Sequence, residues 1–259
     1  MSAPHIHDSG AGPALLLLHA FPLDASQWDA QVAALSGRYR CLRPDFWGCG
    51  ASPPPPAGVT VDSYTADVLG ALSALGVDEF SVCGISMGGY MCFSLLRQAR
   101  PRLRSVALVN TRAVADGEQA LAARAAMAGE VRAGGVEAIV EAMTGRLLCA
   151  LCHAESHIAD PVRGRIRRCT ADGLLTAIAA IGGRPDSSGM LPGIDVPTLV
   201  VCGTTDVIVP LDESRVMAAA IPHAAVEEFD GAAHLTNLEQ PARFSAVLGD
   251  FLDTHTASG

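Results

Sequence analysis

Short apolar runs recur along the chain and alternate with longer stretches of helical periodicity. The runs are rich in Val, Leu and Ile and have the length of strands that are buried on both faces. This alternation is typical of an α/β fold, a doubly wound and mostly parallel sheet covered by helices. We expect strands near 14–20, 39–45, 80–86, 105–110, 197–203 and 224–230, and helices near 26–35, 62–75, 87–99, 212–220 and 241–252.

The alternation is interrupted once, between Asn110 and Val196. This segment has no convincing strand and contains several amphipathic pieces, such as E-Q-A-L-A-A-R-A-A-M-A-G-E-V-R-A. Helices inserted at one point of a parallel sheet are expected to cover the carboxyl ends of the strands, where ligands bind in such folds. We therefore predict a core formed by residues 1–112 and 195–259, with a helical insertion at 113–194 that acts as a lid.

The charged residues favour a small molecule as the partner. The net charge of −9 is spread without a basic stripe, and aromatic residues make up only 5%, so nucleic acid is not expected to bind. All 18 basic residues are arginine. The absence of lysine excludes Schiff-base chemistry and the lysine of a phosphate-binding loop.

The amino-terminal segment predicts neither export nor a membrane anchor. No Lys or Arg precedes Arg38, and the apolar run at 14–20 is too short to span a bilayer. We therefore expect a cytoplasmic protein that does not bind membranes.

The eight cysteines lack the dense, regular spacing of a disulfide scaffold, so reduced thiols are expected. The segment C-A-L-C-H at 149–153 has the spacing of covalent haem attachment, and His157 and Cys169 lie close enough in sequence to suggest zinc. Haem of that kind normally follows export, and helical spacing alone places such groups on one face. We therefore expect no metal or haem here.

Glycines surround a single serine in the segment S-V-C-G-I-S-M-G-G-Y at 81–90. Gly84, Ser86 and Gly88 form the pattern G-x-S-x-G between a predicted strand and a predicted helix. A serine on such a strained, sharp turn is exposed above the sheet as a nucleophile. The alternative is an ordinary turn that happens to contain a serine.

A serine hydroxyl is a weak nucleophile, so it needs a base and an acid that orients the base. His234 lies in a loop before the last predicted helix, and Asp206 lies just past the end of a predicted strand, facing the same cleft. On spacing alone, Asp230 or Asp212 could instead be the acid that orients the histidine. The other histidines are weaker candidates for the base: His5, His7 and His255 near the ends, His153 and His157 in the insertion, and His223 beside a proline.

The order Ser86, Asp206, His234 is the order of the α/β-hydrolase triad. From L-L-L-L-H-A-F-P-L-D through G-I-S-M-G-G to G-A-A-H-L-T-N-L-E-Q-P, the chain resembles the α/β-hydrolase superfamily. The resemblance implies that Ser86 is the nucleophile, His234 the general base and then acid, and Asp206 the orienting group. It assigns the oxyanion hole to the backbone N–H groups of Phe21 and Met87, with Ala20 where the family usually has glycine.

The same resemblance gives structural roles to His19 and Asp45. Among the large side chains expected near the cleft, Trp28, Trp47 and Tyr90 are candidates for the substrate pocket. The arginines of P-V-R-G-R-I-R-R-C at 161–169 are expected to form a solvated helix face, with an anion-binding arginine as the alternative.

Within the superfamily, the chain looks most similar to 3-oxoadipate enol-lactonases and related carboxylesterases. That similarity implies hydrolysis of a small carboxylic ester or lactone through an acyl-enzyme on Ser86, without a metal or organic cofactor. A homodimer is possible. The alternatives that share the triad are carbon–carbon bond hydrolases, cofactor-free haloperoxidases and ligand-sensing receptors with slow turnover.

Overall fold

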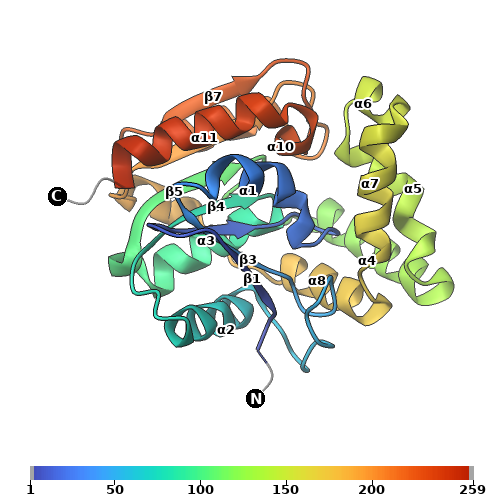
Figure 1. Cartoon of the computed structure of the whole chain (residues 1–259). Coiled ribbons are helices and arrows are strands. Elements are labelled where there is room, and N and C mark those ends of the chain that lie inside the picture. Colours follow the sequence, from blue (N-terminus) through green and yellow to red (C-terminus); the bar gives the residue numbers. More distant parts are fainter. Residues whose placement is uncertain (1–2, 257–259) are drawn as a thin grey trace.

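A seven-stranded sheet forms the centre of the computed structural model, which describes residues 3–256 (Figure 1). The strand order is β1-β3-β2-β4-β5-β6-β7, and all neighbouring strands run parallel except β1 and β3. The strands are β1 (Ile6–Ser9), β2 (Ala14–Leu18), β3 (Arg40–Pro44), β4 (Phe80–Ile85), β5 (Leu103–Val109), β6 (Thr198–Gly203) and β7 (Ala225–Phe229). The predicted mostly parallel sheet is confirmed.

Only β1 lies outside the predicted strands. Its sequence I-H-D-S has a single aliphatic residue, and the strand is a partly exposed, antiparallel edge. An edge strand needs no continuous apolar run, because one side of it faces solvent. The apolar pattern therefore gave no signal for it.

Helices cover both faces of the sheet. Helices α1 (Asp29–Leu35) and α11 (Pro241–Thr256) pack together on one face, whereas α2 (Val61–Ala74) and α3 (Met87–Gln98) pack together on the other (Figure 1). Helix α9 (Leu211–Ala219) packs against β6 and β7. Shorter turns are η1 (Ala25–Trp28), η2 (Arg100–Arg102), η3 (Ser188–Gly193) and α10 (Thr236–Glu239).

The apolar strands and local caps explain these boundaries. Every residue of β4 and of β6 is buried, as expected for central strands covered on both faces. Helix α2 begins where the Thr60 hydroxyl accepts the backbone N–H of Ser63 and the Ser63 hydroxyl accepts that of Thr60. This reciprocal pair satisfies N–H groups that the first helical turn leaves free.

The predicted helical insertion is present between β5 and β6. It consists of α4 (Glu118–Gly134), α5 (Glu137–Leu147), α6 (Ala150–Ala154), α7 (Ser156–Arg167) and α8 (Ala171–Gly182), which lie together to one side of the sheet (Figure 1). The domain boundaries and the movement of these helices as a lid stay predictions. Across residues 3–256, each helix is too short or too polar to cross a bilayer.

One disulfide and one ion pair join the helical insertion to the core. Cys49, in the loop after β3, forms a disulfide with Cys169, between α7 and α8. The expectation of reduced thiols is therefore wrong for this pair, because residues 120 positions apart in sequence meet where the insertion contacts the core. Nearby, the Arg168 guanidinium donates to both carboxylate oxygens of the buried Asp24, at 2.6 and 3.1 Å.

Candidate active site

Ser86 lies on a strained turn at the end of β4, immediately before α3. Its backbone has φ 54° and ψ −110°, a conformation that costs a residue with a side chain about 1 to 3 kcal/mol. The turn is fixed on both sides, since the Ser86 N–H donates to the Val109 carbonyl and the Thr111 hydroxyl donates to the Ser86 carbonyl, each at 2.9 Å. This is the strand-to-helix turn that the G-x-S-x-G pattern predicts.

The glycines around Ser86 allow backbone segments to approach closely. A Cβ on Gly84 would lie 2.2 Å from the Gly88 carbonyl oxygen, and a Cβ on Gly88 would lie 2.2 Å from the Leu18 carbonyl oxygen. A Cβ on Gly89 would meet the Thr111 side chain at 2.4 Å. No larger residue fits at these three positions while β2, β4 and α3 keep their packing.

Asp206 and His234 form a buried pair beside this turn. Asp206 follows β6 and His234 precedes α10, and the Nδ1 atom of His234 lies 2.7 Å from the Asp206 Oδ2 atom. The other Asp206 oxygen accepts the N–H groups of Ile208 and Val209 at 2.8 and 3.1 Å. With Nδ1 facing the carboxylate, the proton sits on that nitrogen and Nε2 is free to accept another.

Burial on its own would raise the pKa of the Asp206 carboxyl, but its neighbours reverse that effect. The charge and hydrogen bond of His234, with hydrogen bonds from Asn110 and from the Val209 N–H, hold the pKa of Asp206 below its usual range. The carboxylate is therefore ionised at neutral pH and can stabilise a positive imidazole.

Asn110 also holds Asp206, and the sequence analysis did not single it out. Its side-chain amide donates to the Asp206 Oδ2 atom at 2.9 Å and to the Ala233 carbonyl at 3.0 Å, while its oxygen accepts the Thr236 hydroxyl at 2.9 Å. Asn110 has φ 43° at the end of β5, a conformation that asparagine tolerates better than most residues. Its position one residue past an apolar strand was the signal that could have found it.

The loop that carries His234 is tied to the helical insertion. The His234 N–H donates to the Leu147 carbonyl at the end of α5, at 3.2 Å. On either side of His234, the N–H groups of Ala233 and Leu235 donate to the Glu239 carboxylate at 3.0 and 3.3 Å. The position of the imidazole therefore depends on both Glu239 and the insertion.

Asp230 and Asp212, the rivals for the acid, lie elsewhere. Asp230 is exposed at the end of β7, and Asp212 is an exposed partner of Arg215 at 3.5 Å in α9.

His19 and Asp45 have internal hydrogen bonds: His19 accepts the Phe46 N–H at 2.9 Å, and Asp45 accepts the Ala25 and Ala51 N–H groups at 2.7 and 2.8 Å.

One pocket under the helical insertion is lined by Ser86, His234, Phe21 and Tyr90. The backbone N–H groups of Phe21 and Met87 donate no hydrogen bond to any residue within 3–256, so they are available for an oxyanion. The structure has no hydrogen bond between Ser86 and His234, and such contacts often tighten only when substrate is bound. The remaining lining residues are Arg112, Asp116, Ala120, Ala123, Arg124, Met127, Met143, Arg146, Ile181 and Ile208.

Trp28 and Trp47, the other two candidates for the pocket, do not line it. The Trp28 ring is enclosed in the core and packs against Phe244 with ring centroids 6.0 Å apart. Trp47 is also buried, and its indole N–H donates to Asp67 at 3.3 Å. Large apolar rings near a cleft are more often packed into the core than exposed to substrate, and these two follow that tendency.

Three arginines and one aspartate give the pocket its charge. Asp116 is paired with Arg124 and, at 2.8 Å, with Arg184, and these cations hold the pKa of Asp116 below its usual range although burial opposes them. Arg112 is ion-paired with Glu213 at 3.3 Å and donates to the Ile208 carbonyl at 2.6 Å, and its buried Nε–H has no partner. Arg146 is exposed and makes no ion pair within residues 3–256.

The arginines of 161–169 have other partners. Arg163 and Arg167 pair with Glu141 and Glu137 on the exposed face of the insertion, whereas Arg165 and Arg168 contact Ser26 and Asp24 of the core. None of them lines the pocket. The cations near Ser86 come instead from α4, from α5 and from the end of β5.

Comparisons with known proteins agree with this geometry. A model described as the alpha/beta hydrolase family matches residues 15–247, so the chain belongs to that family. It is 29% identical to 3-oxoadipate enol-lactonase 1 of Acinetobacter baylyi, over 93% of this chain and 88% of that one.

Two solved structures share the whole architecture. A thermophilic esterase from Thermogutta terrifontis with malate bound has a TM-score of 0.93 and 34% identity, over 97% of this chain and 93% of that one. The enol-lactonase from Burkholderia xenovorans LB400 has a TM-score of 0.89 and 31% identity, over 96% of each chain. The chain is thus similar to both esterases and enol-lactonases.

Proposed function

We propose that the protein is a serine hydrolase that cleaves a small carboxylic ester or lactone through an acyl-enzyme on Ser86. One observation carries the proposal: Ser86, on its strained turn, lines the same pocket as a histidine whose Nδ1 atom is bound to a buried carboxylate. A nucleophile, a base and an orienting acid are the groups that acyl transfer requires.

The reaction begins when the Ser86 Oγ atom attacks the substrate carbonyl carbon and the Nε2 atom of His234 takes the hydroxyl proton. The imidazole becomes positive, and the ionised Asp206 stabilises it. The carbonyl oxygen becomes an oxyanion that the N–H groups of Phe21 and Met87 bind. One such donor contributes about 3 to 4 kcal/mol to transition-state stabilisation.

Collapse of this intermediate breaks the bond to the leaving oxygen, which takes the proton from His234. Water then attacks the acyl-enzyme while Nε2 accepts one of its protons, and the acid product leaves as Ser86 recovers its hydrogen. In a lactone the leaving oxygen stays attached to the acyl group, so a single hydroxy or oxo acid is released. These steps use no metal or organic cofactor.

The charge of the pocket favours a substrate with a carboxylate. Arg146 has no ion-pair partner within residues 3–256, so it can bind an anion without breaking an existing pair, whereas Arg112 is already paired with Glu213. The malate in the Thermogutta terrifontis esterase supports this preference, because malate is a dicarboxylate. We therefore propose an anionic ester or lactone as the substrate class.

The first test measures hydrolysis of 4-nitrophenyl acetate, butyrate and octanoate and of an enol-lactone by the native protein and by Ser86→Ala. We expect turnover of at least one substrate and a loss of about a thousandfold or more in Ser86→Ala. If both proteins are equally inactive, the proposal fails. A carbon–carbon hydrolase would instead cleave a dienol ketone, and a receptor would be stabilised by its ligand with little turnover.

A matched pair of esters tests the substrate class. Mono-4-nitrophenyl succinate differs from 4-nitrophenyl butyrate mainly by its terminal carboxylate. We expect the native protein to prefer the succinate ester in kcat/KM by about tenfold or more, and Arg146→Met to lose most of that preference. Arg167→Met, which removes an exposed cation outside the pocket, is the control. Equal kcat/KM for the two esters would contradict an anionic substrate.

A further inference from the structure

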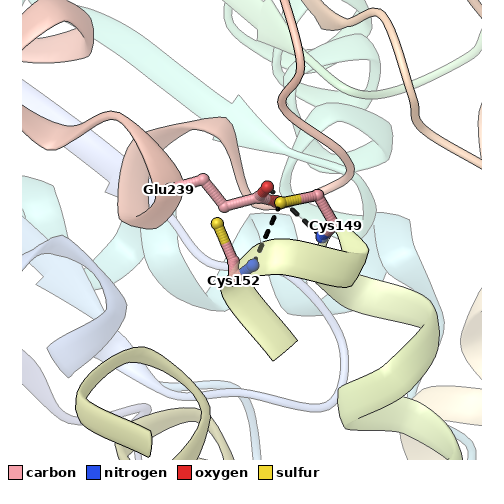
Figure 2. A group of neighbouring side chains, drawn as sticks. All are labelled: Cys149, Cys152 and Glu239. Carbon is pink, nitrogen blue, oxygen red and sulfur yellow. Dashed lines mark hydrogen bonds between the residues drawn. The ribbon is translucent and has the colours of Figure 1, made fainter. Parts of the chain in front are cut away.

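Two cysteines and a glutamate meet where α6 contacts the loop that carries His234. Figure 2 shows the Cys149 and Cys152 sulfur atoms turned toward the Glu239 carboxylate, with α6 on one side and α10 on the other. The two Sγ atoms and a Glu239 oxygen all lie within 4.8 Å of one another. Each of the three residues is half-buried, so the group is accessible to a small ion from solvent.

Hydrogen bonds prearrange this group. The Cys152 N–H donates to the Cys149 Sγ atom at 3.3 Å, and the Cys149 N–H donates to the Glu239 Oε2 atom at 3.3 Å (Figure 2). The first bond orients the Cys149 side chain, and the second holds the Glu239 carboxylate beside it. The Cys149 sulfur and the Glu239 carboxylate therefore have fixed positions before any ion arrives.

The Glu239 carboxylate can exchange one of its hydrogen bonds for an ion. Its Oε2 atom accepts the N–H groups of Cys149 and Ala233, and its Oε1 atom accepts that of Leu235. A carboxylate has about four acceptor sites, and the Cys152 thiol is hydrogen-bonded to this carboxylate as well. A bound ion would take the place of that thiol proton. An ion can bind there without displacing the hydrogen bonds that hold the loop on both sides of His234.

The ligand types select the class of ion. Two thiolates and one carboxylate suit zinc and other soft or borderline divalent cations, whereas magnesium and calcium need oxygen ligands. Tetrahedral zinc with Zn–S bonds of about 2.3 Å needs its two sulfurs about 3.8 Å apart. This separation is compatible with ligand atoms that all lie within 4.8 Å of one another. Water would complete the fourth position.

We propose that Cys149, Cys152 and Glu239 bind one zinc ion and that this ion clamps the helical insertion to the loop that carries His234. From the sequence we expect no metal in C-A-L-C-H, because helical spacing alone places its thiols and histidine on one face. The structure removes the neighbouring candidates: Cys169 is in a disulfide, and His157 is an exposed partner of Glu155 at 3.6 Å. The third ligand comes from a residue 90 positions away, which local spacing could not reveal.

The clamp has a measurable consequence for stability. An ion bound only by the folded protein raises the thermal midpoint, and at a hundredfold excess over Kd the shift for a chain of this size is about 5 °C or more. The ion would add to the contact already made between the His234 N–H and the Leu147 carbonyl.

The experiment uses the full chain with the Cys49–Cys169 disulfide intact, stripped of metal and kept free of oxygen so that Cys149 and Cys152 stay reduced. Cadmium is added first, because a cadmium–thiolate complex absorbs in the ultraviolet, and zinc is then titrated against a coloured chelator. We expect one equivalent of either ion, with a zinc Kd below about 1 μM, typical of a site that contains thiolates. Ser86→Ala protein should bind equally, which separates this site from the proposed catalysis.

Variants identify the ligands. Cys149→Ser and Cys152→Ser should lose the absorption band and the shift in thermal midpoint, and Glu239→Gln should weaken zinc binding about tenfold or more. Serine remains a good cap at position 149, so circular dichroism should show an unchanged fold. His157→Ala and the double variant Cys49→Ser, Cys169→Ser should bind as the native chain does. An absorption band that survives Cys152→Ser, or native protein that binds no zinc, overturns the proposal.

Discussion

The Asp206 carboxylate and the His234 imidazole are hydrogen-bonded at 2.7 Å although 28 residues separate them in the chain. Both side chains are almost fully buried, with exposed fractions of 0% and 1%. Because the carboxylate is ionised and its other oxygen is occupied by backbone N–H groups, it can hold only one imidazole tautomer. In the proposed mechanism, this pair decides whether Ser86 can be activated.

Asp206→Asn tests that relationship. The amide keeps the size of the carboxylate but can donate to Nδ1, which favours the imidazole tautomer that cannot accept the Ser86 proton. We expect kcat to fall about ten-thousandfold with a nearly unchanged thermal midpoint. Steady-state kinetics and thermal unfolding of the same preparation provide the check, and a fall in kcat below tenfold would contradict the assigned role.

Asn110→Gly tests the residue that holds Asp206. Glycine tolerates the positive φ at this position, so the change removes the side-chain hydrogen bonds without adding backbone strain. We expect kcat to fall about ten- to a hundredfold, as for the loss of one or two hydrogen bonds to a charged group. KM should change little because Asn110 does not line the pocket. An unchanged kcat with a raised KM would instead indicate a contact with substrate.

Gly88→Ala tests the close packing around the turn. The added Cβ would lie 2.2 Å from the Leu18 carbonyl oxygen, so β2 and α3 would have to separate. We expect a loss of about 3 kcal/mol or more in the free energy of unfolding, together with loss of activity. Gly129→Ala in α4 is the matched control, since its Cβ meets nothing within 4 Å. That variant should be neutral or more stable by up to about 1 kcal/mol. Equal stability of the two variants would contradict the packing.

The pair of Asp24 and Arg168 predicts a dependence of stability on pH. Burial opposes ionisation of Asp24, but hydrogen bonds from Arg168 and Ser26 outweigh it and hold the pKa below its ordinary value of 3.8. A carboxyl with a lowered pKa in the folded state stabilises the protein above the ordinary value, and this contribution is lost as pH falls through the folded value.

We therefore expect Asp24→Asn to lower the free energy of unfolding by about 1 to 3 kcal/mol at pH 7. The difference from the native protein should shrink as pH falls below about 4. Urea unfolding between pH 7 and pH 3 measures both quantities. Glu137→Gln, which removes an exposed ion pair of the insertion, should have little effect at any pH. A difference that stays constant with pH would argue against the ion pair as its cause.

The disulfide between Cys49 and Cys169 predicts a response to reduction. It closes a loop of 120 residues, and the chain-entropy model gives such a link up to about 5 kcal/mol of stabilisation. We expect a phosphine reductant to lower the thermal midpoint of the native protein by about 5 °C or more. The double variant Cys49→Ser, Cys169→Ser should show the lower midpoint with or without reductant. If the native protein does not respond, the link does not stabilise the fold.

The sequence predicted the sheet and the strand-to-helix turn because these depend on local patterns. Central strands such as β4 are continuous apolar runs, and the glycines beside Ser86 mark a turn whose neighbours approach too closely for any Cβ. Strand β1 escaped prediction because an exposed edge needs only one apolar face.

The candidate site was predictable only where family motifs mark it. The motifs pointed to Ser86, Asp206 and His234, but Asn110 and Glu239 carry no motif, since their importance comes from hydrogen bonds made across the fold. Trp28 and Trp47 are candidates for the pocket because they are large side chains expected near the cleft. Whether such a ring faces the cleft or the core depends on packing, and both rings are buried in the core.

By itself, the sequence determined the order of strands and helices and the turn that presents Ser86, because apolar periodicity and glycine placement act over a few residues. Only the tertiary structure decided which arginines face the pocket, which cysteines pair and which carboxylate joins Cys149 and Cys152. Those choices depend on contacts between residues up to 120 positions apart, which are fixed when the helical insertion packs on the core. Sequence spacing contains no measure of such distances.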